Sequence, residues 1–146
     1  MLNEIYRGIG KVEVEDQIDV TQQLLDLYPF IAKSKVAIWG WSYGGFVTAS
    51  VLALDADKRN IFKCGISVAP VSNWIYYDSI YAERYLGLPT REDNLKGYQA
   101  SDMTAKAKKL KNKKYLMVHG TADDNVHYQQ SMMLARAFEE ADVLHK

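Results

Sequence analysis

Three short runs of apolar residues stand out in the pattern of hydrophobic and polar positions. They lie at 35–39, 62–69 and 115–119, and Pro70 stops the second run. Runs of this length that are bounded by turn residues are typical of buried β-strands. The pattern therefore predicts three buried strands.

Segments of helical periodicity lie between these runs. From Glu13 to Tyr28, apolar positions recur at spacings of three and four, acidic residues crowd the first turns, and Pro29 ends the pattern. Further helices are predicted over 44–54, over 74–85, from a capping residue at Thr90, over 101–110, and after residue 125. Within 74–85, Tyr77, Tyr81 and Tyr85 are four residues apart, so the pattern places them on one helix face.

Strands that alternate with helices predict right-handed βαβ units and a parallel sheet, which is an α/β fold. A length of 146 residues fits one domain or part of one. Three strands are few for a doubly wound sheet, and parallel strands normally need both faces and both flanks covered. We therefore expect the sheet to be incomplete at both ends.

Composition changes this picture little. The chain is 48% hydrophobic and 25% charged, as ordinary globular proteins are, and its 18 basic residues balance its 18 acidic ones. Zero net charge gives no reason to expect nucleic acid or an anionic membrane as a partner, and the basic cluster at 106–114 is predicted to be a solvated face. No run is long enough to span a bilayer, and residues 1–4 show no secretory signal.

A candidate nucleophile lies between the first strand and the helix that follows it. Residues 40–44 read Gly-Trp-Ser-Tyr-Gly, a G-x-S-x-G pattern centred on Ser42. The bare pattern also occurs in ordinary turns, but a position between strand and helix is typical of a nucleophile elbow. Glycines allow the tight turn, and the helix N-terminus favours a developing oxyanion beside the serine hydroxyl.

A nucleophilic serine needs a base and an orienting carboxylate, which follow it in the order acid, then histidine, in α/β hydrolases. Asp123 and Asp124 follow the third strand, at the end where ligand chemistry gathers, although such a pair can also simply cap a helix. His119 lies inside the strand and before the acid, and His127 is too close to it. His145 has the right order but lies near the start of a further strand, so we expect none of the three to be the base.

Several stretches of the chain resemble one family. They are G-W-S-Y-G-G at 40–45, F-K-C-G at 62–65, the segment from A-P-V-S to Tyr85 at 69–85, and H-G-T-A-D-D-N-V-H at 119–127. Together they resemble the dipeptidyl peptidase IV and fibroblast activation protein branch of the prolyl oligopeptidase-type serine peptidases. The resemblance runs from about Glu13 to Phe138. It implies a partial α/β-hydrolase fold and a serine-type exopeptidase that releases N-terminal Xaa-Pro or Xaa-Ala dipeptides.

The resemblance also implies roles for single residues. Ser42 would be the nucleophile, Asp123 the triad acid, and Tyr43 an oxyanion donor through its backbone N–H. Asn125 would hold a substrate carbonyl. The walls of a proline-accepting pocket would be Val71, Trp74, Tyr77, Tyr81 and Val126. Aromatic faces suit a flat proline ring, although core packing is the alternative for these tyrosines. No metal ion or cofactor is expected.

Other parts of the family pattern have no match in residues 1–146. The resemblance places a β-propeller and a second oxyanion donor, a tyrosine, upstream of Met1. It places the catalytic histidine, and the cysteine that pairs with the residue matching Cys64, beyond Lys146. We therefore expect 1–146 to be part of one α/β-hydrolase catalytic domain, truncated at both ends and inactive alone.

For the full-length parent, the resemblance implies peptide substrates with penultimate proline or alanine, a homodimer, and either secretion or a type II plasma-membrane anchor. Two alternatives belong to other functional classes. A non-catalytic relative that acts as a binding protein or membrane-channel partner is disfavoured by the presence of Ser42 and Asp123. A lipase or esterase of the same fold is disfavoured by the aromatic segment and by the 123–125 loop.

Overall fold

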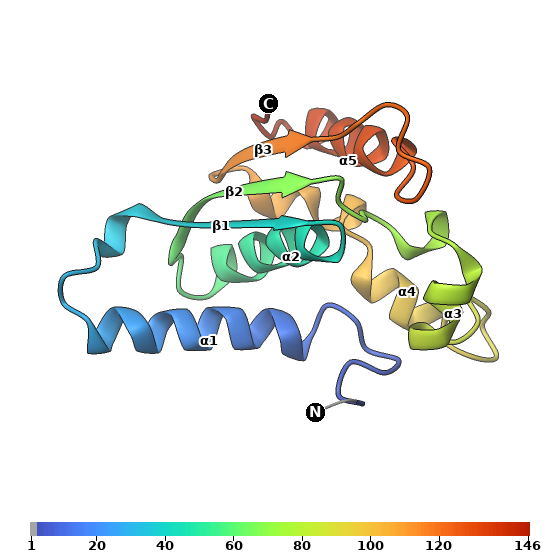
Figure 1. Cartoon of the computed structure of the whole chain (residues 1–146), viewed down its shortest axis with the longest axis horizontal. Coiled ribbons are helices and arrows are strands. Elements are labelled where there is room, and N and C mark those ends of the chain that lie inside the picture. Colours follow the sequence, from blue (N-terminus) through green and yellow to red (C-terminus); the bar gives the residue numbers. More distant parts are fainter. Residues whose placement is uncertain (1–2) are drawn as a thin grey trace.

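A three-stranded parallel sheet lies at the centre of the computed structural model, which describes residues 3–146 (Figure 1). The strands are β1 (Val36–Trp41), β2 (Phe62–Val68) and β3 (Lys114–Val118), in the order β1-β2-β3. The predicted α/β class and parallel sheet are confirmed. Met1 and Leu2, which belong to the segment without a secretory signal, lie outside the described residues.

Helices connect the strands. They are α1 (Val12–Leu27), α2 (Tyr43–Asp57), α3 (Ser79–Leu86), α4 (Leu95–Ser101) and α5 (Gln129–Glu140), with 3₁₀ segments η1 (Lys33–Lys35), η2 (Trp74–Tyr76) and η3 (Thr104–Leu110). In α1 the buried residues are Val14, Ile18 and Leu25, which are three of the positions that the spacing predicts. No helix in the described part is both long and apolar enough to cross a membrane.

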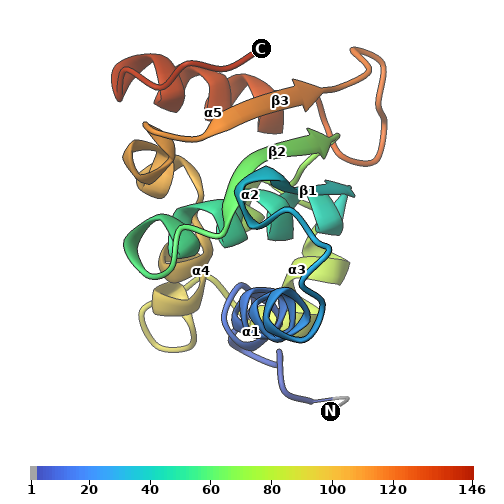
Figure 2. The ribbon, with the colours of Figure 1, turned by 90° about the vertical axis from the view of Figure 1, so that its left-hand side faces the viewer.

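Helix α2 lies directly on one face of β1 and β2 (Figure 2). Phe46, Val51 and Leu52 in this helix are fully buried. Gly65 in β2 permits the close approach, because an added Cβ would lie 2.6 Å from Leu52 Cδ1 and 2.9 Å from Thr48 Cγ2. A larger residue at position 65 would clash with α2, so the close packing of helix and sheet requires glycine here.

The opposite face of the sheet is open within the described residues. Trp39 and Trp41 are 70% and 67% exposed. Ile66 and Leu116, which lie in register with Trp39, and Val118, in register with Trp41 through β2, are exposed too. The prediction of buried strands is therefore wrong for this face. An apolar run does not reveal whether one face or both are covered.

The helix predicted over 74–85 is broken in the structure. Residues 77 and 78 have extended backbone, and α3 begins only at Ser79. The Asp78 carboxylate accepts a hydrogen bond from the N–H of Tyr81 over 2.8 Å, which caps the new helix. Tyr77 therefore lies outside the helix that carries Tyr81 and Tyr85, although the three rings still form a row.

Two other helix predictions are wrong in part. Thr90 does not cap a helix, because residues 91–94 form turns and α4 starts at Leu95. The helix predicted over 101–110 is divided between the end of α4 at Ser101 and the 3₁₀ segment η3. The polar turn at 88–94 instead binds the N-terminal loop, as described below.

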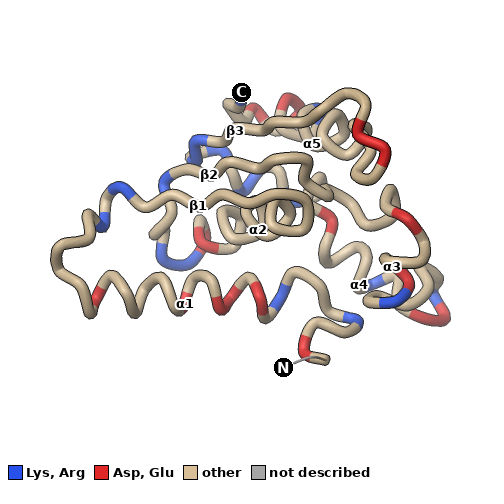
Figure 3. The backbone as a smooth tube through the Cα atoms, in the orientation of Figure 1, with Lys and Arg blue, Asp and Glu red and all other residues tan. Residues whose placement is uncertain are grey.

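Charged residues keep away from the middle of the sheet (Figure 3). Lys and Arg gather where the strands begin, and acidic residues lie on the loop after β3. One lysine of the basic cluster at 106–114 corrects the prediction of a solvated face. Lys113 is buried, and its Nζ donates to Asp55 Oδ2 over 3.0 Å, to Asn60 Oδ1 over 2.8 Å and to the Phe62 carbonyl over 2.7 Å.

Candidate active site

Ser42 lies on a strained turn between β1 and α2. Its φ is 56° and its ψ is −117°, a backbone conformation that residues with a Cβ rarely adopt. An added Cβ at Gly40 would lie 2.2 Å from the Gly44 carbonyl oxygen, and one at Gly45 would lie 2.9 Å from Pro70 Cβ. At Gly44 it would meet no atom within 4 Å, so the steric need for glycine holds at 40 and 45 but not at 44.

Tyr43 has two separate environments, one for its backbone and one for its ring. It is the first residue of α2, and its N–H donates no hydrogen bond within the described residues. Its hydroxyl donates to Glu13 Oε1 over 2.6 Å, and its ring packs on Phe46 and Trp74. Burial, with help from the Glu13 carboxylate, raises the pKa of this hydroxyl far above its usual value. The side chain is thus anchored while the backbone N–H beside Ser42 stays free.

Asp123 is held by the loop that follows β3. Its Oδ1 accepts hydrogen bonds from the N–H groups of Asn125 and Val126, each over 3.0 Å, and its Oδ2 lies 3.5 Å from His119 Nε2. Neither this residue nor Asp124 caps α5, whose N-cap is Tyr128. Asp123 therefore caps the turns at 124–128 that lead into α5, rather than α5 itself. Asp123 is an oriented, partly exposed carboxylate.

None of the three histidines forms a hydrogen bond with Ser42, whose hydroxyl makes no hydrogen bond within the described residues. His119 is buried, with Nε2 bonded to the Val126 carbonyl over 2.7 Å and Nδ1 to Ser131 Oγ over 2.6 Å. His145 pairs with Tyr115 at the start of β3, far along the strand from its carboxyl end. His127 is exposed on the loop. The expectation that none of them is the base is consistent with these positions.

The predicted pocket residues come together from two segments. Trp74 is buried and stacks on Tyr81 with ring centres 5.8 Å apart and planes 9° apart, while Tyr77 meets its edge at 5.8 Å and 89°. The Tyr77 hydroxyl donates to Asn125 Oδ1 over 2.6 Å. Burial raises the pKa of both tyrosines. Trp74 forms a floor beneath Tyr77 and Tyr81, and its buried indole N–H has no acceptor among the described residues.

Val71 and Val126 are buried beside this aromatic group, at 2% and 3% exposure. Both valines belong to the buried core in this structure, as Trp74 does. The two tyrosines are only partly buried. Of the predicted pocket set, Tyr77 and Tyr81 thus present the accessible surface.

A cavity of about 480 Å³ opens between the two segments. Its lining contains two predicted residues, Tyr77 and Asn125, together with Tyr76, Asp78, Asp124 and His127. The cavity is more polar than the sequence pattern suggests, with two carboxylates in its wall. The added residues all neighbour predicted ones along the chain, and Asp124 and His127 also belong to the motif at 119–127.

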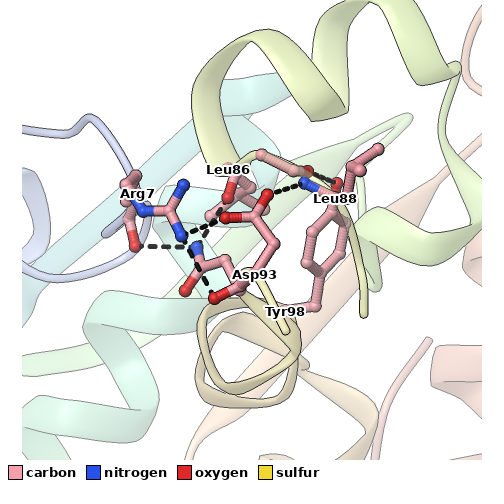
Figure 4. Close-up of polar contacts among 7 residues, drawn as sticks. Arg7, Leu86, Leu88, Asp93 and Tyr98 are labelled. Atoms are coloured by element: carbon pink, nitrogen blue, oxygen red, sulfur yellow. Dashed lines mark hydrogen bonds and ion pairs between the residues drawn. The ribbon is translucent and has the colours of Figure 1, made fainter. Parts of the chain in front are cut away.

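The end of α3 is tied to the N-terminal loop by a polar cluster (Figure 4). The Arg7 guanidinium pairs with the Asp93 carboxylate, which also accepts the N–H of Leu88 over 2.5 Å. The backbone N–H of Arg7 donates to the Tyr85 carbonyl over 2.6 Å. These contacts, first the Leu88 N–H and then Arg7, lower the pKa of Asp93. The helix that carries Tyr81 is thereby fixed at its C-terminal end.

No group of three or more histidine, cysteine, aspartate and glutamate side chains within residues 3–146 could hold a metal ion. The free thiol of Cys64 is partly buried on β2.

Comparison with known proteins agrees with this geometry. The sequence is 57% identical over 144 residues to venom dipeptidyl peptidase 4 of Vespa velutina, and 51% identical over 143 residues to dipeptidyl peptidase 4 of Bos taurus. These alignments cover 99% and 98% of this chain but only 18% of each relative. The crystal structure of Porphyromonas gingivalis dipeptidyl peptidase 4 matches with a TM-score of 0.89 and 37% identity, over 99% of this chain and 20% of that one.

The sequence profile of the prolyl oligopeptidase family matches residues 2–146. The chain spans about a fifth of the length of the relatives it matches, so the match describes one part of their architecture. The matched residues 2–146 include the strained Ser42 turn, the oriented Asp123 and the aromatic segment. This chain belongs to the prolyl oligopeptidase family.

Proposed function

We propose that this chain carries the nucleophile and the acid of a serine peptidase that releases N-terminal dipeptides with proline or alanine in the second position. The observation that carries the proposal is the conformation of Ser42. A positive φ in a non-glycine residue costs free energy, and such strain is typical of active sites. The names and high identity of the relatives support the reaction type.

In the proposed mechanism, Ser42 Oγ attacks the carbonyl carbon of the residue in the second position. The Tyr43 N–H, unbonded at the start of α2, stabilises the oxyanion that forms. Asp123 orients a histidine that takes the serine proton and then protonates the leaving amine. The family resemblance implies that this histidine lies outside residues 1–146, and the absence of a hydrogen bond from His119, His127 or His145 to Ser42 among the described residues supports that proposal. Water then hydrolyses the acyl-enzyme.

The proposed specificity comes from the two tyrosines. Tyr77 and Tyr81 present rings over the buried Trp74, which suits the flat face of proline. Asn125 accepts the Tyr77 hydroxyl through Oδ1, so its Nδ2 remains to donate to a substrate carbonyl. The full-length protein is proposed to be a homodimer that is either secreted or held by a type II plasma-membrane anchor. Relatives named as venom enzymes support entry into the secretory pathway.

A chimeric enzyme tests the function. In it, this chain replaces the matching segment of Vespa velutina venom dipeptidyl peptidase 4, which supplies the remaining parts. We expect the chimera to cleave Xaa-Pro and Xaa-Ala substrates. Replacing Ser42 with alanine should lower turnover by a factor on the order of 10⁶, as loss of a protease nucleophile does. Near-normal activity of the S42A chimera would exclude the assignment.

The non-catalytic alternative has a distinct outcome. A chimera that folds and dimerises but neither hydrolyses substrates nor reacts with a fluorophosphonate probe would favour a binding or membrane-channel role. The isolated 146-residue chain is the second arm of the test. We expect it to show no steady peptidase turnover, since its serine lacks a base. Turnover that is abolished by His145→Ala would contradict this.

A further inference from the structure

We propose that Gln130, in α5, is a positioning residue. It holds residues 71–74, which carry the floor of the proline pocket, against α5, and it thereby determines the preference for proline. The inference rests on the proposed function, because it concerns the specificity of that same site. Neither the sequence pattern nor the family resemblance pointed to this residue. Gln130 lies in the first turn of α5 and is fully buried.

The side-chain amide of Gln130 forms hydrogen bonds with the backbone of Ser72 and Asn73, which are distant in sequence. Its Oε1 accepts the N–H of Ser72 over 2.8 Å and the N–H of Asn73 over 3.0 Å, and its Nε2 donates to the Asn73 carbonyl over 3.2 Å. The Ser72 hydroxyl donates to the Gln130 carbonyl over 2.7 Å. The orientation of the amide follows from its partners, because a reversed amide would direct its NH₂ group at two N–H donors.

These bonds replace a missing β-ladder. The direct backbone pairing of β2 with β3 continues only to the bond from Ala69 N–H to the Val118 carbonyl. Beyond it the chain is buried but irregular at Ser72, so its polar groups need other partners. Gln130 accepts the N–H groups of Ser72 and Asn73, and the backbone N–H of Met103 donates to the Ser72 carbonyl over 2.9 Å.

The segment that Gln130 holds carries the floor of the pocket. Val71 and Trp74 flank Ser72 and Asn73 directly, and Trp74 supports both Tyr77 and Tyr81. On the other side, Gln130 follows closely after Val126 and Asn125 in the loop of the candidate acid. One side chain thus joins the two halves of the site, which are 58 residues apart in sequence. Gln130 itself is fully buried and does not line the cavity, so it acts through these neighbours.

Substitutions in the chimeric enzyme test this role. Gln130→Met keeps the length and volume of the side chain but leaves the buried N–H of Ser72 and the partly buried N–H of Asn73 without an acceptor. We expect the ratio of kcat/KM for Xaa-Pro over Xaa-Ala substrates to fall about tenfold, mainly through KM for the proline substrate, because the pocket floor shifts. Gln130→Glu keeps an acceptor oxygen for the two N–H groups but directs its second oxygen at the Asn73 carbonyl, so it should restore only part of the ratio. Gln129→Met, at the exposed neighbour, is the matched control and should change nothing.

The rate at which a fluorophosphonate labels Ser42 separates the possible outcomes. Gln130→Met should label at nearly the parent rate, because the nucleophile and acid stay in place. An equal loss of labelling and of both hydrolytic activities, or an unchanged proline-to-alanine ratio, would overturn the inference. If Gln130→Met does not fold, Gln130→Asn provides the comparison, since its amide is too short to reach Ser72. A parent chimera that itself shows no proline preference would overturn the proposed function, and this inference with it.

Discussion

The hydroxyl of Tyr77 donates a hydrogen bond to Asn125 Oδ1 over 2.6 Å. This contact joins the segment before α3 to the loop after β3, across the mouth of the cavity that both residues line. It leaves the Asn125 amide nitrogen directed elsewhere, with its rotation restricted. A carbonyl-binding side chain that is already held in one orientation loses less entropy when substrate binds.

Tyr77→Phe tests this relationship in the chimeric enzyme. We expect the transition-state stabilisation of Xaa-Pro substrates, calculated from kcat/KM, to fall by about 1 kcal/mol. The reason is that one hydrogen bond is lost while the ring remains. Tyr81→Phe is the matched control, since its hydroxyl makes no hydrogen bond with any residue of 3–146, and it should be nearly neutral. Equal effects of the two changes, measured by steady-state kinetics, would contradict the role of the Asn125 contact.

Removing the rings tests the pocket. Tyr77→Ala and Tyr81→Ala should each weaken the preference for proline over bulkier residues by roughly 1–3 kcal/mol. The physical reason is that each ring presents accessible apolar surface above Trp74. The measurement is the ratio of kcat/KM values for paired substrates that differ only in the second residue. Variants that keep the parent ratio would show that the tyrosines are core residues.

The buried pair of Lys113 and Asp55 should dominate the stability of the sheet's amino end. Lys113→Met leaves the Asp55 carboxylate, whose side chain is fully buried, without its cation, and should lower the free energy of unfolding by about 3–5 kcal/mol. Lys111→Met breaks an exposed pair with Asp142 and should cost less than about 1 kcal/mol. Urea denaturation of both variants checks this contrast, and similar midpoints would refute it.

The open face of the sheet should cause the isolated 146-residue chain to self-associate. Trp39 is 70% exposed beside Ile66 and Leu116 in register, which makes a contiguous apolar surface. Trp39→Lys should shift the chain toward monomer in sedimentation velocity experiments. Leu27→Lys, at an equally exposed apolar residue on α1, is the control and should have a smaller effect. If both changes act alike, association does not occur through the sheet face.

The sequence by itself determined the features that depend on neighbouring residues. The G-x-S-x-G pattern between an apolar run and a helical pattern was sufficient to place Ser42 on a strained turn, because the steric demands arise within a few residues of Gly40. Periodicity predicted the three strands and the buried positions Val14, Ile18 and Leu25 of α1, and the alternation of strands with helices predicted a parallel sheet, although not the order of its strands. The roles assigned to Ser42, Asp123, Tyr43 and the pocket residues stay predictions.

Only the tertiary structure decided what depends on distant segments. An apolar run looks alike whether a helix covers one face or both, so the exposure of Trp39 was hidden. The sequence pattern predicts that the lysines of a basic cluster are solvated, and only the fold shows that Lys113 is buried against Asp55 of α2. Gln130 looked like any polar residue at the start of a helix. Its importance appears only when the chain brings Ser72 and Asn73 beside it, because buried backbone N–H groups must find an acceptor wherever the fold supplies one.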